Sequence, residues 1–355
     1  RRNSRQRTRP HKKYCECRDA GRMHGRLGLA VASCLPLRGA VVENDTKIVD
    51  LQAAVVAQTG SEDFSFKSMQ NLIDSGEEGL HRAYDLIDSR WAEDSKVLLE
   101  SVTLLPPIPR PISLRDFLSF EAHVANALKT GREVGIFSAS RATVPDIWYE
   151  APRYYKCNAL NISGDNQDVH WPSYSSRMDF ELEMGWVIGR KGRDIAPENA
   201  IEHLFGFTIY NDFTARDTLF AEMAARLGPA KGKDFDGGNS LGPWIVTMDE
   251  IGDPHNLEMT AHINGKEFSR GNSGQAYHKI EDCVAYVSRC ETLHPGEILG
   301  SGTVGTGSGI ESDYWLQDGD TVALTIDKIG TLTNKVFGPS ARPYGETKDT
   351  NVQIN

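Results

Sequence analysis

The sequence predicts a strand-rich α+β protein in which a smaller β-containing domain precedes a larger one. A length of 355 residues with 39% hydrophobic content allows a full core. Because single cores stop growing near about 250–300 residues, we expect two units. Strand-like segments and helices follow one another in an irregular order. The regular strand–helix–strand alternation of a doubly wound parallel sheet is absent, which favours the α+β class.

Charge divides the chain into a basic start and an acidic body. The first 27 residues contain ten Lys or Arg against Glu16 and Asp19, a net +8 that leaves −18 for the remainder. This aperiodic basic stretch predicts a disordered tail over 1–27, with a nucleic-acid arm or a targeting peptide as alternatives. The two acidic residues and the lack of an amphipathic pattern argue against targeting. Phosphate binding needs clustered cations, so the acidic body is not expected to bind nucleic acid.

Hydropathy and cysteine usage predict a cytoplasmic protein that does not enter a membrane. No apolar run reaches the roughly 20 residues of a membrane-spanning helix, and the best candidate, near 27–37, is interrupted by Pro36. The six cysteines follow no disulfide spacing, which indicates reduced thiols. Cys15 and Cys17 lack a second pair of ligands nearby, so a zinc site is not expected there.

The first folded unit is predicted over 28–105. A strand, a bend at Asn44 and Asp45 and a second strand lead into helices near 67–76 and 78–88. Prolines are then concentrated in the segment "LLPPIPRPISLRD", which neither a helix interior nor a central strand accepts. We therefore place a domain boundary there, with a larger domain over 106–340 and a C-terminal tail over 341–355.

The larger domain is predicted to contain one long helix near its start, many strands and two further helices. The segment 116–132 is helix-like, with His123 on its apolar stripe and Gly131 at its end. The other predicted strands and helices are, in order, strands at 159–164, 178–189, 204–212, 242–248, 258–265 and 319–336, and helices at 196–204 and 279–293.

Two carboxylates on one apolar strand are the first sign of a functional site. In "MDFELEMGWVIG", residues 178–189, strand geometry points Glu181 and Glu183 to the same face, roughly 7 Å apart. The pair should repel each other. An exposed strand face, where water screens the charges, and a buried face, where a cation holds both, are the two explanations.

Other polar residues stand at points where the chain leaves a strand or forms a glycine-rich loop. Asp212 ends an apolar strand, either as a helix N-cap or as a functional carboxylate. Lys233 lies in "GPAKGKDFDGGNSLGP", which is no P-loop and is either a surface loop or an active-site loop that brings an ammonium to an oxyanion. The glycines of "ILGSGTVGTGSGIE" form tight turns or let the backbone approach a ligand. His123 is a core residue or a catalytic base.

Five motifs in order resemble the fumarylacetoacetate hydrolase family. They are "RDFLSFEAHV", "DFELEMGWVIG", "YNDFTARD", "KGKDFDGGNSLGPW" and "LHPGEILGSGTVGTG", and the likeness runs from about 110 to 337. The segment from about 27 to 100 is similar to the family's smaller leading domain. The resemblance implies a catalytic domain built as a mixed β-sheet roll, and it implies a homodimer.

The resemblance also implies a ligand set and catalytic roles. His123 would activate water, Glu311 would orient the imidazole, and Lys233 would face the oxyanion. A set of carboxylate ligands suits a hard ion, Mg²⁺ first, with Ca²⁺ or Mn²⁺ as alternatives. The residues matching the family's metal ligands are Asp116, Glu181, Glu183 and Asp212. The residues expected to contact the substrate are Arg132, Arg216, Thr303 and Tyr154.

The expected activity is hydrolysis of a carbon–carbon bond in a 1,3-diketo acid or acylpyruvate. Where well-known members present polar groups to the far end of the substrate, this chain has Leu118, Leu219 and Met223, which predicts a more apolar acyl group lined also by Tyr155 and Trp148. Decarboxylation, hydration or tautomerisation at the same kind of metal site is the alternative. A noncatalytic protein in which the cation only ties strands together is the third hypothesis.

Overall fold

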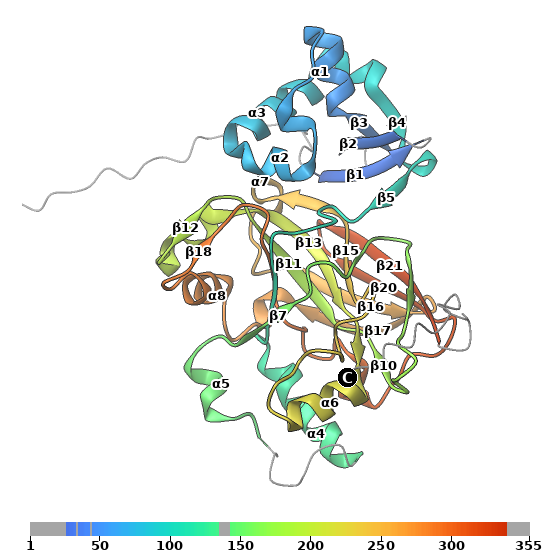
Figure 1. Cartoon of the computed structure of the whole chain (residues 1–355), viewed down its shortest axis with the longest axis vertical. Coiled ribbons are helices and arrows are strands. Elements are labelled where there is room, and N and C mark those ends of the chain that lie inside the picture. Colours follow the sequence, from blue (N-terminus) through green and yellow to red (C-terminus); the bar gives the residue numbers. More distant parts are fainter. Residues whose placement is uncertain (1–25, 33–34, 43–44, 135–142, 339–355) are drawn as a thin grey trace, which may run out of the picture.

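The computed structural model describes residues 26–32, 35–42, 45–134 and 143–338. Most of the predicted basic tail, the whole C-terminal tail, and Cys15, Cys17 and Cys34 lie outside these residues. Within them the protein is a strand-rich α+β structure, as predicted (Figure 1). In this described part of the chain, none of the helices is both long and apolar enough to cross a bilayer.

A sheet of twelve strands forms the centre of the molecule. Its middle strands are β11 (Leu182–Ile188), β13 (Leu204–Asp212) and β15 (Asn239–Thr247), all antiparallel and buried at every position. Strands covered on both faces read as near-continuous apolar runs, which is the pattern that the sequence shows here. Beyond β11 the sheet continues through β19 (Ile298–Gly300), β6 (Leu114–Phe117) and β7 (Tyr154–Cys157). β8 (Ile162–Ser163) pairs with β15.

A five-stranded sheet packs against one face of the central sheet. Trp186 and Phe207 of the central sheet share a hydrophobic core with Leu324 and Leu332 of the second sheet. The strands of the second sheet, in spatial order, are β17 (Lys266–Asn272), β16 (Glu258–Ile263), β20 (Thr321–Ile326), β21 (Gly330–Phe337) and β9 (Asp168–His170). Two small ribbons pair β10 (Met178–Asp179) with β14 (Thr214–Ala215), and β12 (Gly192–Arg193) with β18 (Thr292–Leu293).

The N-terminal unit covers one end of the molecule and continues the central sheet (Figure 1). Its strand β1 pairs antiparallel with β15, and its core is continuous with Val187 and Ile245 of the central strands. The predicted hairpin is present, although residues 43 and 44 of its bend lie outside the described residues. The unit contains β1 (Arg26–Ala32), β2 (Leu35–Val42), β3 (Lys47–Asp50), β4 (Lys96–Leu98), β5 (Thr103–Leu105), α1 (Leu51–Thr59), α2 (Met69–Asp74) and α3 (Gly76–Ile87).

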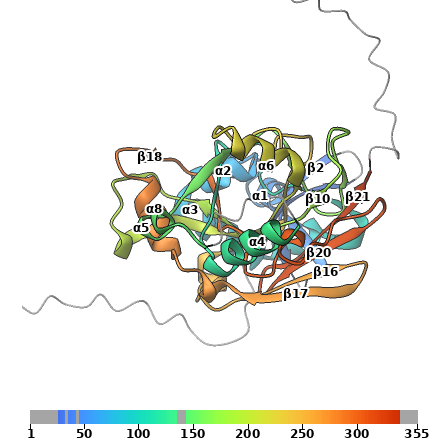
Figure 2. The ribbon, with the colours of Figure 1, turned by 90° about the horizontal axis from the view of Figure 1, so that it is seen from below.

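Helices α4 (Glu121–Glu133) and α6 (Arg216–Ala224) lie at the opposite end of the molecule from the N-terminal unit (Figures 1 and 2). The prediction of one helix over 116–132 was wrong at its start. Asp116 belongs to β6, because backbone pairing with β19 on one side and β7 on the other outweighs the local helical pattern. Gly131 also fails to end the helix. The remaining α-helices of the described residues are α5 (Asp146–Glu150), α7 (Met248–Ile251) and α8 (Ile280–Val287), and the predicted helix over 196–204 is the 3₁₀ helix η4 (Pro197–His203).

The predicted strand over 178–189 is divided into β10 and β11. Glu181 lies between them, and its backbone N–H donates to the side-chain oxygen of Asn211 at 3.0 Å. On the other side it forms only a single bridge, to Ser308. The chain therefore changes partners at Glu181, which period-two alternation cannot reveal.

At Gly206, strand β13 lies too close to the backbone of β15 to leave room for a side chain. A Cβ at this position would lie 2.2 Å from the backbone oxygen of Val246, whereas a Cβ at Gly185 in the neighbouring strand would lie 3.0 Å from a methyl group of Thr208. Backbone cannot yield as a methyl can, so we expect Gly206→Ala to lower the free energy of unfolding by about 1–3 kcal/mol. Urea unfolding would measure this free energy, and Gly185→Ala is the control variant in which a smaller loss is expected. Equal losses in the two variants would contradict this account.

Candidate functional site

Three buried carboxylates converge from three strands of the central sheet. Asp116 in β6, Glu183 in β11 and Asp212 at the end of β13 each present an oxygen within 4.8 Å of the others. Among the described residues, Asp212 Oδ1 has no hydrogen-bond partner although it is buried. Buried polar atoms are almost always satisfied, so an orphan oxygen in an all-carboxylate cluster fits a hard cation.

The glycine-rich loop after β19 closes around two of these carboxylates. The backbone N–H of Gly302 donates to Glu183 Oε2 at 3.0 Å and to Asp116 Oδ1 at 3.2 Å, and Thr303 Oγ1 donates to Glu183 Oε1 at 3.1 Å. Gly302 has a φ of +79°, a backbone conformation that favours glycine. The predicted close approach of backbone is therefore present, and the groups approached are the protein's own carboxylates.

Glu181 lies beside this cluster, where it is paired with two cations. Lys233 Nζ is 2.6 Å from Glu181 Oε2 and also donates to Asp212 Oδ2 at 2.5 Å. Arg216 Nη2 is 2.7 Å from the other oxygen, Glu181 Oε1. Lys233 thus bridges Glu181 to the three-carboxylate cluster, although it is 21 residues from Asp212 in the sequence.

Burial and neighbouring charges act in opposite directions on these groups. Burial raises the pKa of Asp116 and of Glu183, and nearby carboxylates add to this effect. Burial opposes the charge of Lys233, but Asp212 and Glu181 outweigh it and raise the lysine pKa above its usual value. Burial likewise opposes ionisation of Glu181, but Lys233 and Arg216 hold its pKa below the ordinary range. Lys233 therefore stays an ammonium, suited to stabilise negative charge and unsuited to act as a base.

His123 and Glu311 form a buried pair next to the cluster. His123 Nδ1 is 2.8 Å from Glu311 Oε1. The other carboxylate oxygen accepts from Asn126 Nδ2 at 2.9 Å and from the backbone N–H of Thr306 at 2.7 Å, so the acid is held firmly. Burial lowers the pKa of His123, but the charge and hydrogen bond of Glu311 outweigh it, and the pKa is raised from its ordinary value. With Nδ1 engaged, Nε2 is the nitrogen left to accept a proton.

A cavity of about 310 Å³ brings these groups together. The charged and titratable side chains of its described lining are Asp116, His123, Arg153, Glu181, Arg216 and Lys233, beside Tyr154 and Tyr155. Its apolar part comes mainly from the end of β6 and from helices α4 and α6. The apolar lining residues are Phe117, Leu118, Val124, Ala127, Leu128, Leu219, Phe220, Met223 and Pro229.

Of the remaining residues predicted to contact the substrate, some line the cavity and others do not. Tyr154 and Tyr155 line the cavity, and Tyr155 donates its hydroxyl to Asp212 Oδ2 at 2.5 Å. Trp148 is not among the described lining residues, so that prediction was wrong: the indole is buried behind the wall and donates to the backbone oxygen of Leu118 at 2.8 Å. Arg132 lies near the end of α4, outside the described lining, and Thr303 contacts Glu183 instead of facing the cavity.

The N-cap interpretation of Asp212 is also wrong. The residue before α6 is Ala215, with no side-chain cap, and Asp212 ends β13 with its carboxylate in the cluster. The sequence analysis missed two supporting residues, Asn126 and Asp179. Asn126 stands three positions after His123, so helical spacing could have suggested it. Asp179 stands two positions before Glu181, and strand alternation could have suggested that it is a third buried carboxylate there.

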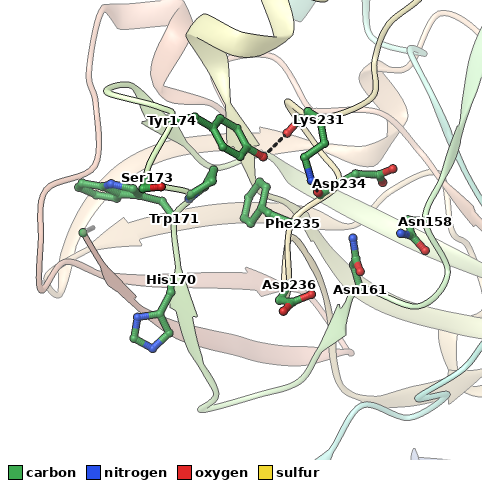
Figure 3. A pocket seen from close by; sticks show the side chains of 12 residues that line it. Asn158, Asn161, His170, Trp171, Ser173, Tyr174, Lys231, Asp234, Phe235 and Asp236 are labelled. Atoms are coloured by element: carbon green, nitrogen blue, oxygen red, sulfur yellow. Dashed lines mark hydrogen bonds between the residues drawn. The ribbon is translucent and has the colours of Figure 1, made fainter. Parts of the chain in front are cut away.

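A second cavity, of about 630 Å³, is lined in part by the loop that carries Lys233 (Figure 3). Lys231, Asp234 and Phe235 line it, and the Tyr174 hydroxyl donates to the backbone oxygen of Lys231 at 2.7 Å. None of the predicted site residues is among its described lining residues. Neighbouring positions of one loop thus face two different cavities.

Known proteins resemble this chain in sequence and in structure. Uncharacterised proteins of Staphylococcus aureus (strain USA300) and Staphylococcus haemolyticus (strain JCSC1435) are 31% and 30% identical over 252 residues, which is 70% of this chain and 77% and 76% of theirs. Fumarylacetoacetate hydrolase from Exiguobacterium antarcticum has a TM-score of 0.67 at 25% identity, over 88% of this chain and 99% of that one.

Maleylpyruvate hydrolase from Sphingobium sp. SYK-6, solved with manganese(II) and pyruvate, shares the fold with a TM-score of 0.65 at 23% identity, over 88% and 99% of the two chains. A 2-hydroxyhepta-2,4-diene-1,7-dioate isomerase from Mycobacterium marinum shares it with a TM-score of 0.62 at 23% identity, over 89% and 99%. The sequence profile of the fumarylacetoacetate (FAA) hydrolase C-terminal domain matches residues 114–337, the part that holds every residue of the cluster and the dyad. The chain therefore belongs to the fumarylacetoacetate hydrolase family.

Proposed function

We propose that this protein is a divalent-metal-dependent hydrolase that cleaves a carbon–carbon bond of an acylpyruvate or related 1,3-diketo acid with an apolar acyl group. The observation that carries the proposal is the content of one cavity. Asp116 of the three-carboxylate cluster, the ammonium of Lys233 and His123 of the His123–Glu311 pair line the same cavity. Water activation and stabilisation of an oxyanion require these groups together.

The metal ligands in this proposal are Asp116, Glu183 and Asp212, with Glu181 beside them. All-oxygen ligation suits Mg²⁺ first, with Mn²⁺ and Ca²⁺ as alternatives. The orphan oxygen of Asp212 and the manganese ion named for the Sphingobium hydrolase support a divalent cation. When bound, the cation would supply Lewis acidity toward the oxygens of the dicarbonyl unit.

His123 would act as the general base. Its Nε2 takes a proton from water while Glu311 stabilises the imidazolium through Nδ1. The water oxygen adds to the acyl carbonyl carbon, and the bond from that carbon to the methylene carbon breaks. The electron pair remains on the pyruvate fragment as an enolate, which then takes a proton at carbon. The products are a carboxylate, pyruvate and one released proton, with one water consumed.

Lys233 would stabilise the negative charge on the acyl oxygen after water adds. Its raised pKa keeps it charged, and its salt bridges to Glu181 and Asp212 hold it in position before the substrate arrives. Preorganised donors of this kind are among the largest contributions to catalysis. Arg216 would orient the substrate from the same side of the cavity.

The acyl group is proposed to lie against Leu118, Leu219 and Met223. These side chains line the cavity without a polar partner to offer. A carboxylate placed against them would be left unpaired, at a cost of about 1–3 kcal/mol. An aliphatic or aromatic acyl group is therefore expected to be preferred over a fumaryl group.

Isomerisation or decarboxylation at the same site is the second candidate. The isomerase among the structural neighbours favours it, because that protein shares the fold. Both candidate reactions develop enolate-like charge, so Lys233 would serve either. Hydrolysis additionally needs a base for water, and the His123–Glu311 pair is the feature that favours it.

A product assay distinguishes the candidates. With Mg²⁺ or Mn²⁺ and acylpyruvates of increasing acyl length, we expect pyruvate and a carboxylic acid that carries ¹⁸O when the reaction runs in H₂¹⁸O. Mass spectrometry would measure both products, with metal-stripped protein as the control. Unlabelled isomers, or carbon dioxide from oxaloacetate without acylpyruvate cleavage, would favour the second candidate. No turnover of any oxo acid, with metal removal only lowering the melting temperature, would favour a structural cation.

Replacing the acid of the dyad should shift the pH dependence. Glu311→Gln removes the charge that raises the pKa of His123, so this pKa falls. Because the base is lost as pH falls through its pKa, the acid limb of the kcat profile should move to lower pH, while the maximal kcat drops about 100-fold or more. The control is Glu121→Gln, which replaces an exposed acid at the start of α4, the helix that carries His123. An unmoved acid limb in Glu311→Gln would contradict the dyad.

Crowding Asp116 should weaken metal binding. A Cβ at Gly300 would lie 2.4 Å from Asp116 Oδ1, whereas a Cβ at its sheet partner Gly185 would meet nothing closer than 3.0 Å. We expect Gly300→Ala to raise the Kd for Mn²⁺ about 10-fold or more, since displaced ligand shells typically cost this much. Isothermal titration calorimetry would measure it against Gly185→Ala. Equal affinities in both variants would remove Asp116 from the proposed ligand set.

A further inference from the structure

Asp179 is a fully buried carboxylate at the edge of the site that contacts neither the cavity nor the three-carboxylate cluster. It accepts hydrogen bonds from two separate parts of the chain. Arg216 donates from Nε at 3.0 Å and from Nη2 at 2.8 Å to Asp179 Oδ2. The backbone N–H groups of Gly309 and Ile310 donate at 2.7 Å and 3.0 Å to Oδ1 and Oδ2.

These donors belong to Arg216, which lines the cavity, and to the turn that carries Glu311. Arg216 is the first residue of α6, and it also binds Glu181. Gly309 and Ile310 begin the 3₁₀ turn η6 (Gly309–Ser312), whose third residue is Glu311, the partner of His123. One carboxylate therefore joins the arginine of the cavity to the turn that carries the acid of the dyad.

The contact with the turn is too close for any residue other than glycine. A Cβ at Gly309 would lie 2.7 Å from Asp179 Oδ1 and 2.1 Å from the backbone oxygen of Tyr314. The backbone of the turn at Gly309 is therefore in close contact with the Asp179 carboxylate. Charge-assisted hydrogen bonds to backbone N–H groups are among the stronger ones, so this contact restrains the turn in one position.

We propose that Asp179 is a positioning residue that holds Glu311 on His123 and keeps the charge of Arg216 balanced. The proposal rests on the proposed function only in that the dyad is the machinery being positioned. Asp179 neutralises one side of the guanidinium and leaves the other side for Glu181. It also fixes the first two residues of η6, so the Glu311 carboxylate meets the imidazole.

Replacing Asp179 by Asn tests both roles with little change in volume. An amide can accept from only one side, so its NH₂ group would face either Arg216 or a backbone N–H, donor against donor. The turn would then shift, and the charge of Arg216 would be less balanced. In the proposed reaction, we expect kcat to fall roughly 10- to 100-fold with a smaller change in KM, as is typical when a supporting partner of a site is lost.

The closing measurement does not depend on activity. The charges of Glu311 from η6, Glu181 from the segment before β11 and Arg216 from α6 act on the pKa of His123, and Asp116 of β6, Arg153 and Lys233 line the same cavity as the imidazole. Displacing Glu311 and unbalancing Arg216 both disfavour the imidazolium. NMR titration of the full chain should therefore show a lower pKa of His123 in Asp179→Asn, in the same direction as in Glu311→Gln. His123→Gln identifies the resonance.

The matched control is Asp217→Asn. Asp217 is the next residue of α6 and also accepts several hydrogen bonds, from Ser175, Ser176 and Thr218, but it does not bind Arg216 or the η6 turn. Its replacement should leave the titration of His123 unchanged. An unchanged titration in Asp179→Asn would overturn the proposal, whether or not the protein cleaves acylpyruvates. A lowered His123 pKa without any oxo-acid turnover would instead count against the proposed function alone.

A second comparison covers the case in which Asp179→Asn does not fold because the buried charge of Arg216 is left with Glu181 as its one carboxylate partner among the described residues. The double variant Asp179→Asn with Arg216→Gln removes that charge, and Arg216→Gln alone is its reference. If Asp179 restrains the turn, the double variant shows a lower His123 pKa than its reference. Equal values would show that Asp179 acts on Arg216 only and would overturn the positioning of Glu311.

Discussion

The placement of like charges in a buried site is the constraint on which the rest of the structure depends. Five carboxylates and two cations lie together at one end of the central sheet, which leaves a formal charge of −3 on side chains that are almost fully buried. Uncompensated charge of this size is strongly unfavourable away from water. The cluster is stable only if cations, dipoles or an added ion balance it. This balance accounts for Lys233, Arg216 and the backbone N–H groups directed at the carboxylates.

The fold meets this constraint by bringing strands from distant parts of the sequence into one sheet. β6, β11 and β13 lie close together in the sheet, with only β19 between β6 and β11, and each delivers one carboxylate to the cluster. The glycines after β19 let backbone N–H groups approach these oxygens at hydrogen-bond distance. A packed sheet is a rigid support, which suits a site whose three oxygens must be held at fixed separations.

The cavity separates chemistry from substrate selection. The strands and the loop of Lys233 supply the carboxylates and the ammonium, whereas α4 and α6 supply most of the apolar wall together with His123 and Arg216. A change in the two helices can therefore alter the acyl group without disturbing the charged cluster. This division is consistent with a fold on which both hydrolases and isomerases are found. In the proposed function, the charged groups would set the class of reaction, and the apolar residues of the helices would set which acyl group fits.

The sequence by itself determined the fold class, most central strands and the identity of the chemical groups. Buried strands such as 204–212 are long apolar runs, and polar residues that interrupt such runs stand out, which is why Glu181, Glu183 and Asp212 were found. Local patterns gave the wrong structure where pairing with distant strands outweighs local preference. The sequence around Asp116 has a helical pattern, but the residue lies in β6 because β19 and β7 pair with that strand.

Only the tertiary structure decided which of these groups meet. The bond of His123 to Glu311 spans 188 residues, and Asp179 reaches the Gly309 turn across 130. It also decided that Glu181 pairs with Lys233 and Arg216, and that Trp148 stands behind the cavity wall instead of in it. The physical reason is that side-chain periodicity reports only the face on which a residue lies. The partner on that face is set by sheet order and loop closure, which no local pattern encodes.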